Sequence, residues 1–118
     1  MRARISSEVV RLYAHFYGRG PTRAQTHVAE DHVLTVLEDV LTPAERTLVA
    51  AGRGDHVRQT RRIFQETLRE PFIAVVEEAT GRRVRAFLSQ TTTEPEVAVE
   101  LFLLEPEGAG ADAEAAGP

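Results

Sequence analysis

The sequence predicts an α+β domain in which two β-hairpins form one four-stranded antiparallel sheet. An N-terminal helix, a short helix and a long central helix are expected to cover one face of that sheet. Residues 54–80 repeat their apolar side chains every three, four or seven positions, as one face of an amphipathic helix does. Two pairs of short apolar segments, each joined by a turn, have the form of hairpins. Two hairpins combine most economically in one antiparallel sheet with helices on one side.

The chain starts with a predicted helix over residues 5–17. Ser6 or Ser7 can cap its N-terminus, and Gly18 is expected to end it. Its apolar face consists of Ile5, Val9, Leu12, Tyr13 and Phe16.

The first hairpin and the short helix follow in order. Residues 23–28 and 32–37 are predicted to be its strands, and the second strand is apolar enough to be mostly buried. Thr42, Pro43 and Glu45 then form the sharpest local signal in the chain. Threonine at the N-cap, proline at the first helical position and glutamate at the third form a capping box. A short helix should therefore begin there and end near Gly52.

The long central helix is predicted to contain an irregularity. Pro71 has no N–H to donate to the carbonyl of Thr67 and crowds that carbonyl, so we expect a kink or two abutting helices. Ile63 and Ile73 lie away from the apolar stripe, which suggests a second apolar contact, such as another subunit. The stripe expected to face the core consists of Val57, Phe64, Leu68, Phe72, Val75 and Ala79.

The second hairpin completes the domain. Residues 84–90 and 96–104 are predicted strands, and the second of them alternates strictly. Residues 91–95 form the predicted turn. The domain is expected to span residues 1–105, and the acidic, Gly- and Ala-rich residues 106–118 have nothing to bury and should be disordered.

Composition excludes several classes of protein. The chain of 118 residues has no cysteine, which excludes disulfides and thiolate chemistry and suits a reducing cytoplasm. We expect no signal peptide and no membrane span, because no apolar segment is long enough. Residues 1–93 carry fourteen arginines against eleven acids, whereas residues 94–118 carry seven acids and no base. This weak positive excess argues against a nucleic-acid partner, because phosphate binding needs concentrated positive charge.

Two glycine-rich loops, at residues 18–21 and 52–55, are candidate anion sites. Each could present backbone N–H groups together with one arginine, Arg19 or Arg53. Neither loop has the spacing of a phosphate-binding or dinucleotide-binding motif. The alternative interpretation is that the glycines only end helices.

A row of arginines on the long helix is the main candidate site. At helical spacing these side chains could hold an anionic ligand, an acidic partner or an anionic membrane face. The alternative is a solvated face paired with Glu66 and Glu70. The row consists of Arg58, Arg61, Arg62, Gln65 and Arg69.

No catalytic or metal-binding constellation stands out. His27 and His32 flank two acids at a hairpin tip, but a zinc site needs three or four convergent ligands. Glu38 and Asp39 are adjacent and should point apart, which does not favour acid–base chemistry. We therefore expect no cofactor, no metal and no enzymatic activity.

Several segments resemble one small bacterial family, the MpsC-like C component of the sodium-translocating membrane-potential-generating system, formerly a domain of unknown function. The likeness covers roughly residues 4–104 and is carried by residues 5–13, 18–22, 41–48 and 87–89, among others. It implies a soluble component that works beside a membrane ion-translocating or bicarbonate-uptake system. It implies no catalytic residues. Pro71 departs from the helix former expected at that place.

Together these observations predict a cytoplasmic, non-enzymatic accessory or regulatory protein that acts by protein–protein contact, with the inner face of the membrane as one location where it could act. A homodimer is expected, through a bare sheet face or an open edge. Its other expected partners are the subunits of a membrane transport complex. The alternative is a sensor of a small anion, such as bicarbonate or a phosphate-containing ligand, that uses Arg58, Arg62 and a glycine-rich loop.

Overall fold

The computed structural model describes residues 1–107 and confirms the predicted α+β fold. The acidic tail expected over residues 106–118 lies almost entirely outside this described part. Within it, no helix is both long and apolar enough to cross a membrane. Its elements are α1 (Arg2–Tyr17), β1 (Arg23–Val28), β2 (His32–Glu38), α2 (Pro43–Ala50), α3 (Gly54–Thr67), α4 (Arg69–Thr80), β3 (Val84–Thr93) and β4 (Glu96–Leu104).

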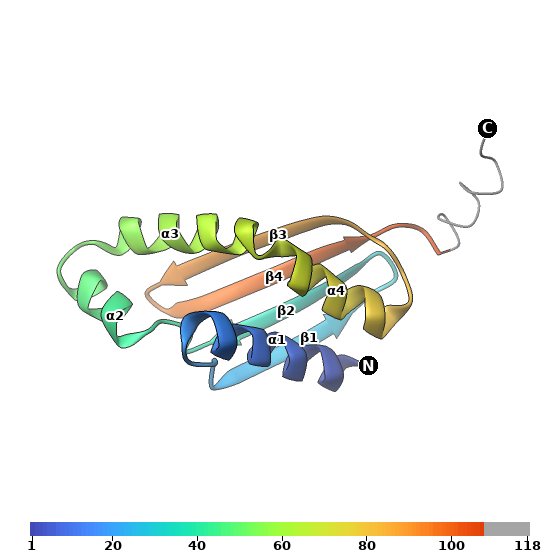
Figure 1. Ribbon diagram of the computed structural model, residues 1–118, viewed down its shortest axis with the longest axis horizontal. Coiled ribbons are helices and arrows are strands. Elements are labelled where there is room, and N and C mark those ends of the chain that lie inside the picture. Colours follow the sequence, from blue (N-terminus) through green and yellow to red (C-terminus); the bar gives the residue numbers. More distant parts are fainter. Residues whose placement is uncertain (108–118) are drawn as a thin grey trace.

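The four strands form one antiparallel sheet in the order β1-β2-β4-β3. Each hairpin therefore supplies one central and one edge strand, and β2 pairs with β4 to join them. Figure 1 shows α1, α3 and α4 lying across the same face of this sheet, with α2 beyond its end. The prediction that helices cover a single face is confirmed for α1, α3 and α4, whereas the short helix α2, which was also expected on that face, lies beyond its end.

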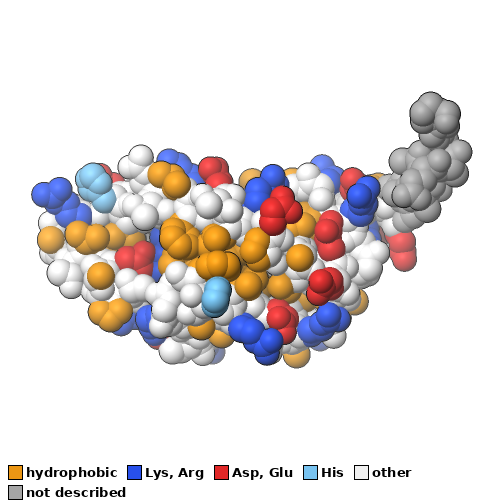
Figure 2. Space-filling model, viewed as in Figure 1, with side chains coloured by type: hydrophobic (Ala, Val, Ile, Leu, Met, Phe, Trp, Pro, Cys, Tyr) orange, Lys and Arg blue, Asp and Glu red, His pale blue; other side chains and the backbone are white. Residues whose placement is uncertain are grey.

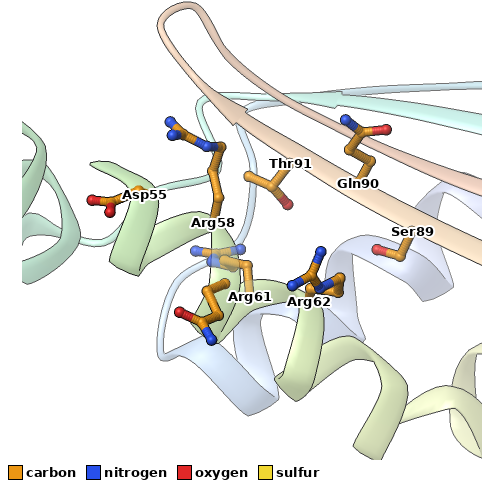
Figure 3. A pocket seen from close by; sticks show the side chains of 8 residues that line it. Asp55, Arg58, Arg61, Arg62, Ser89, Gln90 and Thr91 are labelled. Atoms are coloured by element: carbon orange, nitrogen blue, oxygen red, sulfur yellow. The ribbon is translucent and has the colours of Figure 1, made fainter. Parts of the chain in front are cut away.

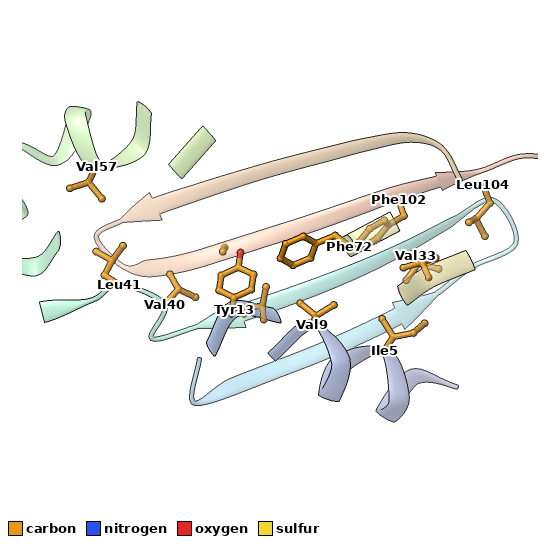
Figure 4. Packing of buried hydrophobic residues seen from close by; sticks show 13 residues of the cluster. Ile5, Val9, Tyr13, Val33, Val40, Leu41, Val57, Phe72, Phe102 and Leu104 are labelled. Atoms are coloured by element: carbon orange, nitrogen blue, oxygen red, sulfur yellow. The ribbon is translucent and has the colours of Figure 1, made fainter. Parts of the chain in front are cut away.

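The core lies between this sheet face and the helices (Figure 4). Ile5, Val9 and Tyr13 of α1 are fully buried against the sheet, and Phe72 of α4 stacks on Phe87. The inward-facing positions of the central strands are also fully or almost fully buried: Val33, Thr35 and Leu37 of β2, and Ala98, Glu100, Phe102 and Leu104 of β4. Two of these inward positions, Thr35 and Glu100, are polar and lie opposite each other.

The start of α1 differs from the prediction. The helix begins at Arg2, and no side chain caps it. Ser6 and Ser7 lie inside the helix, where the Ser6 hydroxyl is 2.7 Å from the hydroxyl of Thr26 on β1. The prediction of a serine cap was wrong because the helix starts one turn earlier, with the N–H of Ile5 donating to the carbonyl of Met1. Gly18 ends the helix as predicted, in the left-handed conformation at φ 84°.

The capping box of the short helix is confirmed. The backbone N–H of Glu45 donates to the Thr42 hydroxyl, and the N–H of Thr42 donates to the Glu45 carboxylate. Pro43 occupies the first turn, where its missing N–H costs nothing. These contacts fix the direction in which α2 leaves the sheet.

The long central segment consists of two abutting helices. α3 ends at Thr67 and α4 begins at Arg69, with Leu68 between them. Pro71 explains the position of the break, because it cannot bond to the carbonyl of Thr67. The predicted apolar stripe holds for Val57 and Phe72, which are buried, but is wrong for Phe64, which is 36% exposed. The buried face of α3 is instead Val57, Arg61 and Gln65.

The second hairpin is longer than predicted. β3 continues through the three threonines to Thr93, and only Glu94 and Pro95 form the turn. Threonine favours extended backbone, and the register continues without interruption to Thr93 opposite Glu96. β3 therefore runs the full length of α3.

Candidate functional site

A pocket of about 550 Å³ lies between α3 and the edge strand β3. Arg58, Arg61 and Arg62 of α3 form one wall, and Ser89, Gln90 and Thr91 of β3 form the other (Figure 3). Asp55, in the first turn of α3, is the acid on its lining. The pocket thus gathers three members of the predicted arginine row.

The row itself is divided by the fold. Arg58 and Arg62 are exposed, whereas Arg61 and Gln65 are each only 1% exposed and face the core. Within residues 1–107 neither Arg58 nor Arg62 forms an ion pair, so the pairing with Glu66 and Glu70 that the alternative interpretation required is not seen. The guanidinium of Arg58 donates instead to the hydroxyl of Thr93, at 3.2 Å.

Arg61 is buried and held by several polar contacts. Its Nε and Nη2 donate to the two carboxylate oxygens of Glu45 at 2.7 and 2.6 Å, and Nη2 also donates to the carbonyl of Val40. Its guanidinium carbon lies 3.8 Å from the ring centre of Tyr17. Burial alone would raise the pKa of Glu45, but its hydrogen bonds with Arg61 and Thr42 outweigh burial and lower it.

A second buried polar cluster surrounds Glu100, which is fully buried on β4. The hydroxyl of Tyr13 donates to Glu100 Oε1 at 2.5 Å, and the hydroxyl of Ser89 donates to the same oxygen at 3.0 Å. Burial raises the pKa of Glu100 to about 7, although these bonds and the charge of Arg61 act in the opposite direction. Ser89 connects this cluster to the pocket, because it lines the pocket wall.

Three buried polar atoms near the pocket have no hydrogen-bond partner among the described residues. They are Arg61 Nη1, Gln65 Oε1 and Glu100 Oε2. Gln65 also lines a smaller cavity of about 190 Å³, which shares Arg62 and Ser89 with the pocket. Because buried polar groups are nearly always satisfied, unpartnered atoms of this kind indicate a place for water or a ligand.

Sequence reasoning missed Tyr13, Glu45, Ser89 and Glu100 as members of this site. One signal was available. Glu100 is in phase with Ala98 and Phe102, so a strand that buries those two residues must also bury its only central charge.

The remaining candidate arginines lie elsewhere. Arg19 donates to the backbone carbonyls of Asp39 and Leu41, both at 2.8 Å, and to the carboxylate of Asp39. It therefore fastens two loops together. Arg53 precedes α3, Arg69 begins α4, and both are exposed. Neither lines the pocket.

At the tip of the first hairpin, His32 Nδ1 lies 2.8 Å from Asp31. Within residues 1–107 no three His, Asp or Glu side chains come close enough to hold a metal ion.

The face of the sheet opposite the helices is uncovered and apolar. On the two central strands its residues are aliphatic, and each retains partial exposure: Leu34, Val36, Val97, Val99, Leu101 and Leu103. On β3, Leu88 is 53% exposed and lies opposite Leu101. An antiparallel sheet with one solvated face normally carries polar residues there. This second surface therefore has the composition of an interface.

The helix-bearing face also displays apolar side chains, gathered near the junction of α3 and α4 and surrounded by charged groups (Figure 2). A shallow groove of about 170 Å³ there is lined by Ile63, Phe64 and Leu68. Ile63 is 57% exposed, whereas Ile73 is partly buried.

These features define a class of small α+β protein, with a single-sided helix layer, an arginine-lined pocket and an open apolar sheet face. The chain belongs to the MpsC family, described as Na+-translocating membrane potential-generating system (MpsC), whose model matches residues 1–106. It is also similar to a Bacillus subtilis (strain 168) protein described as uncharacterized protein YbcI. The two are 25% identical over 105 residues, which is 88% of this chain and 85% of the relative. No solved structure matches the chain.

Proposed function

We propose that this chain is a non-enzymatic accessory component of a membrane ion-translocating system, working at the cytoplasmic face through protein–protein contacts. The description of its family, a membrane potential-generating system, supports the association. The observation that carries the contact role is the uncovered apolar face of the sheet. Its central strands carry six aliphatic side chains, and Leu88 lies beside them. Exposing this apolar surface to water is unfavourable.

A second copy of the chain is the occupant that this face fits. The four strands have 6, 7, 10 and 9 residues and lie about 4.8 Å apart, so they present a face of roughly 500 Å² per copy. Two such faces bury about 1,000 Å² in total, which is near the minimum for a specific interface. The centre of the face is uncharged, so two copies related by a twofold axis can pack without opposing like charges. Two such sheets pack face to face about 10 Å apart.

Size-exclusion chromatography with light scattering tests the dimer. The wild-type chain should have twice the 13.0 kDa mass of one chain. Leu101→Glu puts a charge in the middle of the face and should give a monomer, whereas Ile63→Glu, on the helix side, should stay dimeric. A monomeric wild type at about 100 μM would exclude the second copy as the occupant.

Recovery of partners from native membranes tests the association. The wild-type chain and the Ile63→Glu and Leu101→Glu variants should each be used as bait. We expect the wild type to recover subunits of an ion-translocating complex. Loss of those subunits with Leu101→Glu but not with Ile63→Glu would assign the contact to the sheet face or to the dimer. Failure of the wild type to recover any membrane transport protein would contradict the proposal.

A further inference from the structure

We propose that the pocket between α3 and β3 binds a small, multiply charged oxyanion. This binding function goes beyond the contact role proposed above and uses a different surface. The open face is formed mainly by β2 and β4, whereas the pocket lies at the β3 edge against α3.

The charge of the pocket favours an anion. Arg58 and Arg62 are one helical turn apart, and their side chains extend from α3 toward β3 (Figure 3). Arg61 also lines the pocket, but its charge is balanced by Glu45, so Arg58 and Arg62 against Asp55 leave one positive charge in excess. Neither Arg58 nor Arg62 has an ion-pair partner within residues 1–107. Guanidinium groups match the geometry of carboxylate and phosphate oxygens, which accept two parallel hydrogen bonds.

Arg61 supplies an independent indication. It is 1% exposed and held rigidly by Glu45, yet its Nη1 has no partner among the described residues. A buried, charged donor of this kind is nearly always satisfied in a folded protein. Because the other two nitrogens of the guanidinium already hold Glu45 and Val40, Nη1 is the donor of this pocket-lining side chain that remains unused. Its fixed position means that binding would not have to order it.

The opposite wall limits the class of ligand. Ser89, Gln90 and Thr91 offer two hydroxyls and an amide, and the pocket lining contains no aromatic ring on which a nucleobase could stack. Compact polar anions such as polyphosphates and polycarboxylates fit this chemistry.

Isothermal titration calorimetry at low ionic strength tests this inference, with pyrophosphate and citrate as probes. Wild type should bind at least one of them. Arg62→Gln removes a charge-assisted donor from the pocket and should weaken binding by about tenfold or more. Arg69→Gln makes the same charge change on an exposed residue outside the pocket and should change affinity by less than about twofold. Circular dichroism should show that both variants are folded.

Three outcomes would overturn the inference. The first is no heat with either probe up to about 10 mM. The second is equal weakening by Arg62→Gln and Arg69→Gln, which would mean that only the overall charge matters. The third concerns vesicles that contain an anionic phospholipid. If the protein binds these vesicles through Arg62 but does not bind the free probes, the arginines bind lipid headgroups instead. Because Leu101→Glu should leave probe binding unchanged, failure here can be told apart from failure of the dimer.

Discussion

Glu100 shows how a single residue can make the stability of the whole chain depend on pH. Its carboxyl is buried, and burial raises its pKa to about 7 from an ordinary 4.5. The folded state therefore holds this proton over a pH range in which the unfolded chain has already released it. Linkage makes the free energy of unfolding fall as pH rises from about 4.5 to about 7, because the folded state binds more protons there.

Glu100→Gln should abolish this pH dependence. The free energy of unfolding of the wild type should fall by on the order of 3 kcal/mol between pH 5 and pH 8. The glutamine keeps an acceptor for Tyr13 and Ser89 but does not titrate, so the variant should be nearly flat over the same range. Urea denaturation at several pH values measures this, with Glu94→Gln in the exposed turn as the control that keeps the wild-type slope. A wild-type slope retained in Glu100→Gln would contradict the assignment.

Arg61 should matter for stability far more than its neighbour in the same row. Arg61→Met leaves the carboxylate of Glu45 and the carbonyl of Val40 without their buried donor, and should cost about 3 kcal/mol. Arg62→Met, on the exposed side of α3, should change the free energy of unfolding by less than about 0.5 kcal/mol. Denaturation by urea compares the two variants, and equal effects would show that the Arg61–Glu45 contact is not structural.

At the scale of the element, the break between α3 and α4 decides which side of each helix faces the core. Pro71 stops the hydrogen-bond ladder at Thr67, so α3 and α4 can each direct a different face toward the sheet. α3 buries Arg61 and Gln65, whereas α4 buries Phe72 and Val76. The polar site thus lies over one end of the sheet, and the aromatic core lies under the adjoining helix.

At the short helix, the capping box should have a measurable effect of its own. Thr42→Ala removes the acceptor for the backbone N–H of Glu45 and frees Glu45 from part of its fixed position, which should cost about 1 kcal/mol. Thr47→Ala on the same helix is the matched control, because Thr47 is exposed and alanine is the better helix former. Thermal unfolding compares them. No loss with Thr42→Ala would mean that packing alone holds α2.

On the scale of the whole molecule, the asymmetry between the two sheet faces is the dominant feature. The helices cover one face (Figure 1), and the other displays aliphatic residues that a solitary domain would leave in water. The two sites proposed above, for a second copy and for an anion, occupy different surfaces. Each can therefore be removed without the other.

Dimerisation through the open face should make thermal stability depend on concentration. The melting temperature of the wild type should rise as the protein concentration increases, because mass action favours the folded dimer. Leu101→Glu should lose this dependence, and Ile63→Glu should keep it. Differential scanning calorimetry over a hundredfold range of concentration measures the shift. A wild-type melting temperature that does not change would contradict the dimer.

Local chemistry in the sequence determined the strands of the first hairpin, the capping box at Thr42, the helix end at Gly18 and the division of the central helix near Pro71. Each depends on a few neighbouring residues, so it can be inferred without knowing the rest of the fold. The tertiary structure decided which side of each element faces inward. Alternation places Glu100 on the same side of β4 as Ala98 and Phe102, but β4 is apolar on both sides, so only the fold decided which side lies inside. In the same way, α3 turns Arg61 rather than Phe64 toward the core. That choice depends on partners that are distant in sequence. Tyr13 bonds to Glu100 and Glu45 bonds to Arg61, and these contacts form only once the chain has folded.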